Sequence, residues 1–324
     1  MPRTAENHHA APVDTNRGGG GWLKILIAVL VVAGLVAGAA IWALNKLGHL
    51  SIFQSSGCTA TSSAGSMSLD LEQARNAATI SAVGLSLNVP TFGIQVALAT
   101  ARQESKLHDI GYGDRDSVGL FQQRPSQGWG TQEQIMDPVY ASTKFYQALL
   151  NVPGWQKMSL TQAAQAVQHS GLPDAYAQYG QFATVIAAVF TGGAGPGLGC
   201  TLDGPTFSPQ AKAAGKLLTA RGQAVIDDLR AQFGTANVGK VTGFGADGGS
   251  FDVAAPASAA GGDAAARNWA FANWAAAQAE TLGVGKVSYG GKTWNASDGA
   301  SGWTSDSSAA ATGSSVHIVM VTGS

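Results

Sequence analysis

The sequence predicts a mainly α-helical domain followed by a smaller α+β domain, both behind one N-terminal transmembrane helix. Three observations predict this organisation. An unbroken run of apolar and small residues spans 25–44, helical periodicity dominates 69–190, and strand patterns alternate with a long amphipathic helix after residue 205. At 324 residues the chain is long enough for two domains.

Residues 22–46 are predicted to form the transmembrane helix, with 25–44 in contact with the lipid. About 20 apolar residues at 1.5 Å each cross the hydrocarbon core. A cleaved signal peptide is the alternative, but its apolar core is shorter, about 7–15 residues, and ends in a small-x-small cleavage site. Leu44-Asn-Lys46 lacks that form, so we expect an anchor.

Basic residues set the expected orientation. Arg17 and Lys24 precede the apolar run and Lys46 alone follows it closely, which favours a cytoplasmic N-terminus. Residues 1–21 are polar and end in four glycines, as is typical of a disordered cytoplasmic tail. We therefore expect a single-pass protein of the cell membrane with its bulk outside the cell.

Residues 47–67 are rich in Ser, Thr and Gly and are predicted to be a linker. They carry Cys58, and the second cysteine, Cys200, lies in another Gly-rich segment. The two bracket the predicted helical domain, 68–200. In an oxidising extracellular compartment we expect them to form a disulfide, with two free thiols as the alternative.

Start signals mark the helices of the first domain. Asp70 is a candidate cap, Pro90-Thr91 and Asp137-Pro138 are candidate starts, and either Ser159 or Thr161 begins the next helix. A final helix is expected to end near Phe190. Between the second and third helices, 118–123 reads as one short extended run.

Glu104 is the first candidate for chemistry. Ile94, Ala97, Leu98 and Ala101 recur at the spacing of one helix face, and Glu104 follows three residues later. We expect that face to be packed, and Gly111 and Gly113 to end the helical pattern soon afterwards. Burial and the negative end of a helix both disfavour a charged carboxyl group, which suits a general acid.

Glu104-Ser105, followed by Gly119-Leu120-Phe121-Gln122, resembles the two leading motifs of the lysozyme-like transglycosylase family. The run 113–130 resembles an actinobacterial branch of that family, and the resemblance covers about 68–192. It implies a lysozyme-like fold, glycan strands of peptidoglycan as the partner, Glu104 as the catalytic acid and base, and no cofactor. It also implies substrate-binding roles for Ser105, Gly119, Leu120, Phe121, Gln122, Gln168 and Tyr176.

One of those residues departs from the family pattern, and another has an alternative. The third family motif is Ala-Tyr-Asn, whereas this chain has Ala166-Val167-Gln168, so Gln168 stands in the place of the asparagine. The family tyrosine near the acid corresponds to Tyr176 or Tyr179, and we favour Tyr176. Asp114 and Asp116 lack the remaining ligands of a calcium loop and are expected in turns, with either one a weaker candidate for a second carboxylate.

The second domain, 205–324, is expected to combine a strand at 238–244, a helix at 264–282, a hairpin at 286–294 and a final strand at 316–321. It resembles zinc D-Ala-D-Ala peptidases. Two zinc-binding histidines of that family are replaced by Gly245 and Ser315, leaving Asp252 and His317. A catalytic zinc needs three protein ligands, so we expect a non-catalytic domain without a metal.

Together with the predicted anchor, the resemblance implies a membrane-anchored lytic transglycosylase that acts on the bond between N-acetylmuramic acid and N-acetylglucosamine. A hydrolase pairs its acid with a second carboxylate, and no partner stands out in the sequence. Two alternatives stay open: a hydrolase (muramidase), and a non-catalytic wall-binding scaffold of a secretion or conjugation apparatus. A formal net charge of −1, with 12% charged residues, argues against a nucleic-acid partner.

Overall fold

The computed structural model describes residues 56–169, 174–202, 216–244, 249–257, 263–307 and 313–321, together with four isolated helical positions, Leu30, Val31, Gly34 and Gly38. The chain divides into two units, Met1–Gln54 and Ser55–Ser324. The rest of the predicted membrane helix, 22–46, and the predicted tail, 1–21, lie outside the described residues. Among those that are described, no helix is both long and apolar enough to span a bilayer.

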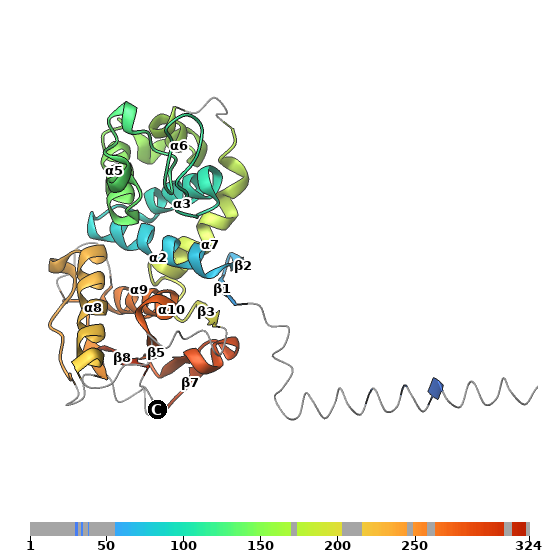
Figure 1. Ribbon diagram of the computed structural model, residues 1–324, viewed down its shortest axis with the longest axis vertical. Coiled ribbons are helices and arrows are strands. Elements are labelled where there is room, and N and C mark those ends of the chain that lie inside the picture. Colours follow the sequence, from blue (N-terminus) through green and yellow to red (C-terminus); the bar gives the residue numbers. More distant parts are fainter. Residues whose placement is uncertain are drawn as a thin grey trace, which may run out of the picture. The chain divides into compact units, whose positions relative to one another are not determined.

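The second unit has a mixed α+β structure (Figure 1). Its α-helices are α2 (Leu71–Ser86), α3 (Thr91–Ser105), α4 (Gln132–Ile135), α5 (Pro138–Leu150), α6 (Leu160–Gln168), α7 (Gly180–Phe190), α8 (Lys216–Phe233), α9 (Ala264–Ala277) and α10 (Ala279–Leu282). Its strands are β1 (Gly57–Ser62), β2 (Gly65–Leu69), β3 (Leu198–Thr201), β4 (Ser250–Val253), β5 (Val284–Tyr289), β6 (Lys292–Asn295), β7 (Thr304–Ser305) and β8 (Val316–Met320). The short 3-10 turns include η3 (Trp155–Lys157), η4 (Ala177–Tyr179) and η6 (Ala296–Ser301).

Local sequence explains where several helices begin. Asp70 and Ser159 each cap a helix through a reciprocal capping box, and the Asp137 side chain accepts hydrogen bonds from the first amides of α5. The choice between Ser159 and Thr161 is thereby decided for Ser159. These side chains satisfy amides that a helix leaves without an internal partner.

The predicted linker 47–67 is wrong in its second half, because residues 57–69 form the hairpin β1–β2. Strand β3 pairs with the other edge of β1, giving the antiparallel order β2-β1-β3. Cys58 and Cys200 face each other across β1 and β3 and form the predicted disulfide. The exposed positions of β1 and β2 are Thr and Ser that alternate with less exposed residues. This composition is the reason that the segment was predicted to be a linker.

Helix α2 lies at the centre of the unit (Figure 1). Its buried residues run from Gln73 to Gly84 and cover most of its circumference, as expected for a helix enclosed on all sides. Gly84 leaves room for Tyr146 of α5, whose hydroxyl donates to the Ile80 carbonyl at 2.9 Å. In Figure 1, α3, α5 and α6 lie on one side of α2, and α9 with the second sheet lies on the other.

The second sheet is antiparallel, in the order β4-β8-β5-β6-β7. The hairpin and the final strand are confirmed. The predicted strand 238–244 is wrong: it contributes a single bridge, Thr242 to Asp252. Glycines interrupt it, and Gly243 has a positive φ of 71°, which breaks a regular strand.

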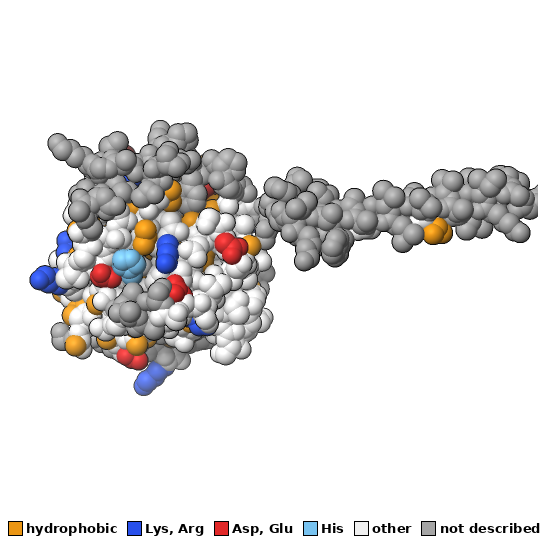
Figure 2. Space-filling view, turned by 90° about the horizontal axis from the view of Figure 1, so that it is seen from below, with side chains coloured by type: hydrophobic (Ala, Val, Ile, Leu, Met, Phe, Trp, Pro, Cys, Tyr) orange, Lys and Arg blue, Asp and Glu red, His pale blue; other side chains and the backbone are white. Residues whose placement is uncertain are grey.

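Acidic and basic side chains lie intermixed on the face of the molecule drawn in Figure 2, with no extensive patch of one sign. This matches a chain whose 19 basic and 20 acidic residues nearly cancel.

The Gly-rich segment after α7 packs tightly against α9. The buried Asn273 side chain donates to the carbonyls of Val189 and Gly195, both at 2.9 Å, and accepts from the Leu198 amide at 3.3 Å. A Cβ on Gly192 would collide with the Ala266 carbonyl, so this position requires glycine. This Gly-rich segment therefore makes a buried contact with α9.

Replacing Asn273 with alanine should lower the free energy of unfolding by about 2–4 kcal/mol, because three backbone groups lose a buried partner. Urea unfolding of the purified chain, followed by tryptophan fluorescence, measures the loss. The control is Asn151→Ala at the exposed C-terminal end of α5, where we expect a change below about 0.5 kcal/mol. Equal small changes in both variants would contradict a structural role for Asn273.

Candidate active site

Glu104 is the second-last residue of α3. Ile94, Ala97, Leu98 and Ala101 are completely buried, as their spacing predicts. Glu104 is only half-buried, so it lies at the edge of the packed face and not within it. The helix ends earlier than the glycines suggest, because Lys106 and Leu107 adopt positive φ values of 57° and 67°. Glu104 therefore combines a rigid backbone with access to solvent.

Tyr176 holds the carboxyl group of Glu104. Its hydroxyl donates a hydrogen bond of 2.8 Å to Glu104 Oε1, and its ring is fully buried. Tyr179, the other candidate, ends the turn η4 that leads into α7. The structure thus places Tyr176 next to the acid, from a segment 72 residues further along the chain.

The motif residues 119–122 form a tight turn and not the short extended run predicted from the sequence. Val118 and Gln123 close the turn through two backbone hydrogen bonds of 3.0 and 3.1 Å. Inside it, Gly119 and Gln122 have φ values of 77° and 49°. A Cβ on Gly119 would lie 2.7 Å from the Ile135 carbonyl, so only glycine fits there without rearrangement.

Leu120 and Phe121 anchor this turn in the core. Both are completely buried, and the Phe121 ring stacks on Phe145 with centroids 4.6 Å apart. Their predicted role was contact with substrate. Their burial shows that their side chains stabilise the turn instead.

Ser105 and Gln168 clamp the same turn from two helices. Ser105 Oγ donates to the Leu120 carbonyl at 2.8 Å, and Gln168 Nε2 donates to the Phe121 carbonyl at 2.9 Å. Ser105 is buried and Gln168 is half-buried. Both residues therefore position the turn relative to α3, and direct contact of either with a substrate stays a prediction.

Gln122 completes the turn on its outer side. Its Nε2 donates at 3.3 Å to the carbonyls of Tyr112 and Gly119. A Cβ on Gly113 would collide with Gln122 Oε1, so the glycine makes room for the amide. Tyr112 is 75% exposed. The seven predicted binding residues and Glu104 are thus joined by contacts between α3, the turn, α6 and the segment before α7.

Neither aspartate of the 113–116 loop is arranged as a catalytic carboxylate. Asp116 accepts from Arg124 Nε and from the Ser126 amide, both at 2.7 Å, and these hydrogen bonds hold the pKa of its carboxyl well below its usual range. Asp114 is largely exposed, 4.0 Å from Arg115. Both are turn residues, as expected, and Asp116 braces the loop that precedes the turn.

Asp109, between Glu104 and the turn in sequence, has a carboxyl group whose pKa is raised. Burial raises its pKa, with further contributions from the charges of Glu72 and Asp137, to about 6. Its Oδ1 is enclosed and has no hydrogen-bond partner among the described residues. No sequence pattern marks Asp109, because its acidic neighbours come from α2 and from the start of α5.

Replacing Asp109 with asparagine should stabilise the protein above pH 6. A raised pKa means that the folded state holds the proton of Asp109 more tightly than the unfolded state does. In the wild type, the stability that this proton contributes is complete below the unfolded pKa and is lost as the pH rises through 6. Asparagine does not titrate and avoids this loss. We expect a gain of about 1–2 kcal/mol at pH 8, after allowing for solvent screening, and little at pH 4. Urea unfolding at both pH values tests this, with the exposed Asp114→Asn as control; a gain independent of pH would contradict it.

An open pocket of about 540 Å³ lies beside α6, lined by residues of that helix, by Lys157 and Met158 before it, and by Asp174 after it. Glu104 is not among its lining residues. No pattern in the sequence predicts this pocket, because it depends on how the two flanking segments fold against α6.

In the second half of the chain, the predicted domain 205–324, Asp252 and His317 face each other on β4 and β8. His317 Nδ1 lies 3.0 Å from Asp252 Oδ1. Ser315 offers no metal-binding nitrogen, and Gly245 lies outside the described residues. Within the part of the chain that the structure describes, no three His, Cys, Asp or Glu side chains form a group that could bind a metal ion.

The chemistry of the first site is that of one positioned carboxyl group. Glu104 is held by a buried tyrosine, and a rigid turn stands against the end of its helix. Comparison with known proteins gives no family for the chain: neither a protein-family model nor a curated protein matches its sequence.

Proposed function

We propose that this chain is a lytic transglycosylase that cleaves the glycan strands of peptidoglycan between N-acetylmuramic acid and N-acetylglucosamine. The observation that carries the proposal is the half-buried Glu104, held by Tyr176 and set beside the turn 119–122 that Ser105 and Gln168 clamp. Fixing a single acid at a solvent-accessible helix end pre-organises it for proton transfer to a polymer that lies across the surface.

The reaction needs one carboxyl group. Glu104 donates its proton to the glycosidic oxygen while the bond to the muramic acid C1 breaks. The C6 hydroxyl of the same sugar then attacks C1, and Glu104, now a carboxylate, removes the hydroxyl proton. The products are a 1,6-anhydro end and a free 4-hydroxyl, and no water is consumed.

Hydrolysis is the alternative reaction for the same site. It would need a second carboxylate as base or nucleophile. Asp116 is bonded to Arg124 and Ser126. Asp109 has one carboxyl oxygen enclosed away from solvent, while its backbone amide donates to Glu72 Oε1. Because the first carboxylate is paired and the second is enclosed, we favour the transglycosylase. The disulfide supports an oxidising extracellular compartment, and with it the proposed single-pass anchor at 22–46.

The test is to incubate the purified full-length chain with peptidoglycan sacculi and to analyse the soluble fragments by mass spectrometry. We expect fragments with 1,6-anhydro ends. Reducing ends would instead indicate a hydrolase. Binding to sacculi without any release would overturn the enzymatic proposal in favour of a wall-binding scaffold, such as one serving a secretion or conjugation apparatus.

The second half is proposed to be non-catalytic. Two potential ligands, Asp252 and His317, are too few to hold a catalytic zinc ion. Addition of a chelator should therefore leave glycan cleavage unchanged, and the chain should not cleave a D-Ala-D-Ala peptide. Stoichiometric zinc in the purified protein, together with chelator-sensitive peptide cleavage, would show that a peptidase site exists.

A further inference from the structure

The pocket beside α6 has the features of a binding site. Helix α6 supplies Thr161, Gln162 and Gln165, and Met158 and Ala166 add apolar side chains to the lining. Its volume of about 540 Å³ lies within the range of roughly 300–1,000 Å³ found for small-molecule sites. Convergent polar groups over an apolar floor are the usual composition of such sites.

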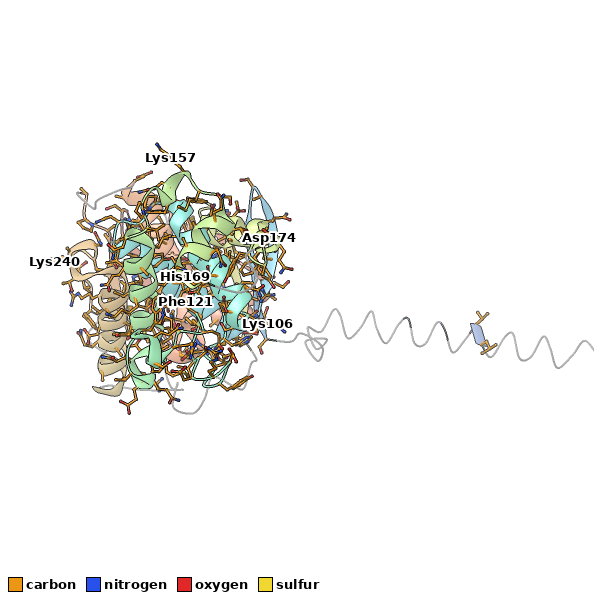
Figure 3. All side chains as sticks on the ribbon, turned by 90° about the horizontal axis from the view of Figure 1, so that it is seen from above. Lys106, Phe121, Lys157, His169, Asp174 and Lys240 are labelled. Atoms are coloured by element: carbon orange, nitrogen blue, oxygen red, sulfur yellow. A yellow bond between two sulfur atoms is a disulfide. The ribbon has the colours of Figure 1, made fainter. Side chains whose placement is uncertain are left out.

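The rim carries groups of both signs. Lys157 and His169 border the pocket at the two ends of α6, and Asp174 borders it from the following segment. All three side chains are exposed, and none makes a hydrogen bond or ion pair to another described side chain. Figure 3 looks onto this end of the molecule and labels all three. Within the described part of the chain, an ammonium group and a carboxylate thus line one pocket without pairing with another side chain, which suits a ligand that carries both charges.

The pocket adjoins the proposed catalytic site through the chain itself. His169 directly follows Gln168, which binds the Phe121 carbonyl, and Asp174 is two residues before Tyr176, which binds Glu104. His169 and Asp174 of the pocket are therefore close in sequence to the residues that position the turn and the acid. Helix α6, which supplies much of the pocket lining, also packs against α3, the helix that carries Glu104.

We infer that this pocket binds the short peptide attached to the glycan strand. The inference rests on the proposed function for the identity of the ligand. Lys157 would pair with a peptide carboxylate and Asp174 with the free amine of a diamino acid, while Thr161 and Gln162 would bind backbone amides. Among the described residues that line the pocket there is no Phe, Tyr or Trp, so this lining lacks the flat apolar ring on which a sugar packs.

The first test measures binding without any cleavage. The full-length chain in detergent micelles is titrated with the synthetic sugar-free tetrapeptide L-Ala-γ-D-Glu-diaminopimelyl-D-Ala in a calorimeter. Binding to the wild-type chain is expected, with about tenfold weaker binding for Lys157→Glu and for Asp174→Lys. Lys240→Glu, an exposed control in the second half, should bind as wild type. No binding, or equal binding by all four proteins, would overturn the inference.

The second test compares cleavage of intact sacculi with cleavage of glycan strands from which an amidase has removed the peptides. Lys157→Glu should slow release from intact sacculi about tenfold and leave release from peptide-free strands unchanged. Equal slowing on both substrates would make the pocket a glycan subsite and overturn the peptide assignment. Peptide binding by a chain that cleaves neither substrate would uphold the pocket and reject the proposed enzyme, so the two failures are distinguishable.

Discussion

Glu104→Gln should reduce the release of soluble fragments from sacculi by about 10³-fold, because general acid–base catalysis contributes roughly 10²–10⁴-fold. The substitution keeps the size of the side chain. The amide oxygen can still accept the 2.8 Å hydrogen bond that the Tyr176 hydroxyl donates in the wild type. Only the proton that protonates the glycosidic oxygen is lost, so the fold should be unaffected.

The measurement is the initial rate of muropeptide release, with thermal unfolding recorded for each variant. Glu133→Gln makes the same chemical change on an exposed residue of the short helix α4 and should retain the wild-type rate. Release by Glu104→Gln within a few-fold of wild type would rule out Glu104 as the acid, and with it the proposed mechanism.

Replacing both Cys58 and Cys200 with alanine should lower the free energy of unfolding by about 4 kcal/mol. The two residues are 142 positions apart, and the chain-entropy model gives a stabilisation of this size for so long a loop. Both side chains are buried between β1 and β3, so the loss includes packing that alanine does not restore. Of the changes considered, this one should affect stability most.

Guanidinium unfolding of the double variant and of the wild type, each with and without reductant, measures the contribution. Reduced wild type should be destabilised to a similar degree as the double variant. A loss below about 1 kcal/mol in both would mean that pairing of β1 with β3 holds this part of the fold without the covalent bond.

Local features of the sequence determined the helix starts and the second-domain hairpin. Asp70, Asp137 and Ser159 cap helices because each satisfies amides within three residues of itself. The turn Gly290-Gly291 fixes its hairpin because both glycines adopt positive φ values. The disulfide was also predictable, since only two cysteines exist to pair. The caps and the hairpin turn depend on neighbours along the chain, which the sequence displays directly, and the disulfide depends on cysteine count.

Only the tertiary structure decided how the site is built. Tyr176, and not Tyr179, bonds to Glu104. Ser105 and Gln168 donate to carbonyls of the 119–122 turn. Asp109 lies near the charges of Glu72 and Asp137, which come from other parts of the chain. The tertiary structure also made strands of residues 57–69 and fastened the Gly-rich segment to Asn273. Apart from the local pairing of β1 with β2, each of these outcomes depends on contacts between residues far apart in sequence, whose geometry and burial are set when the helices and sheets pack together.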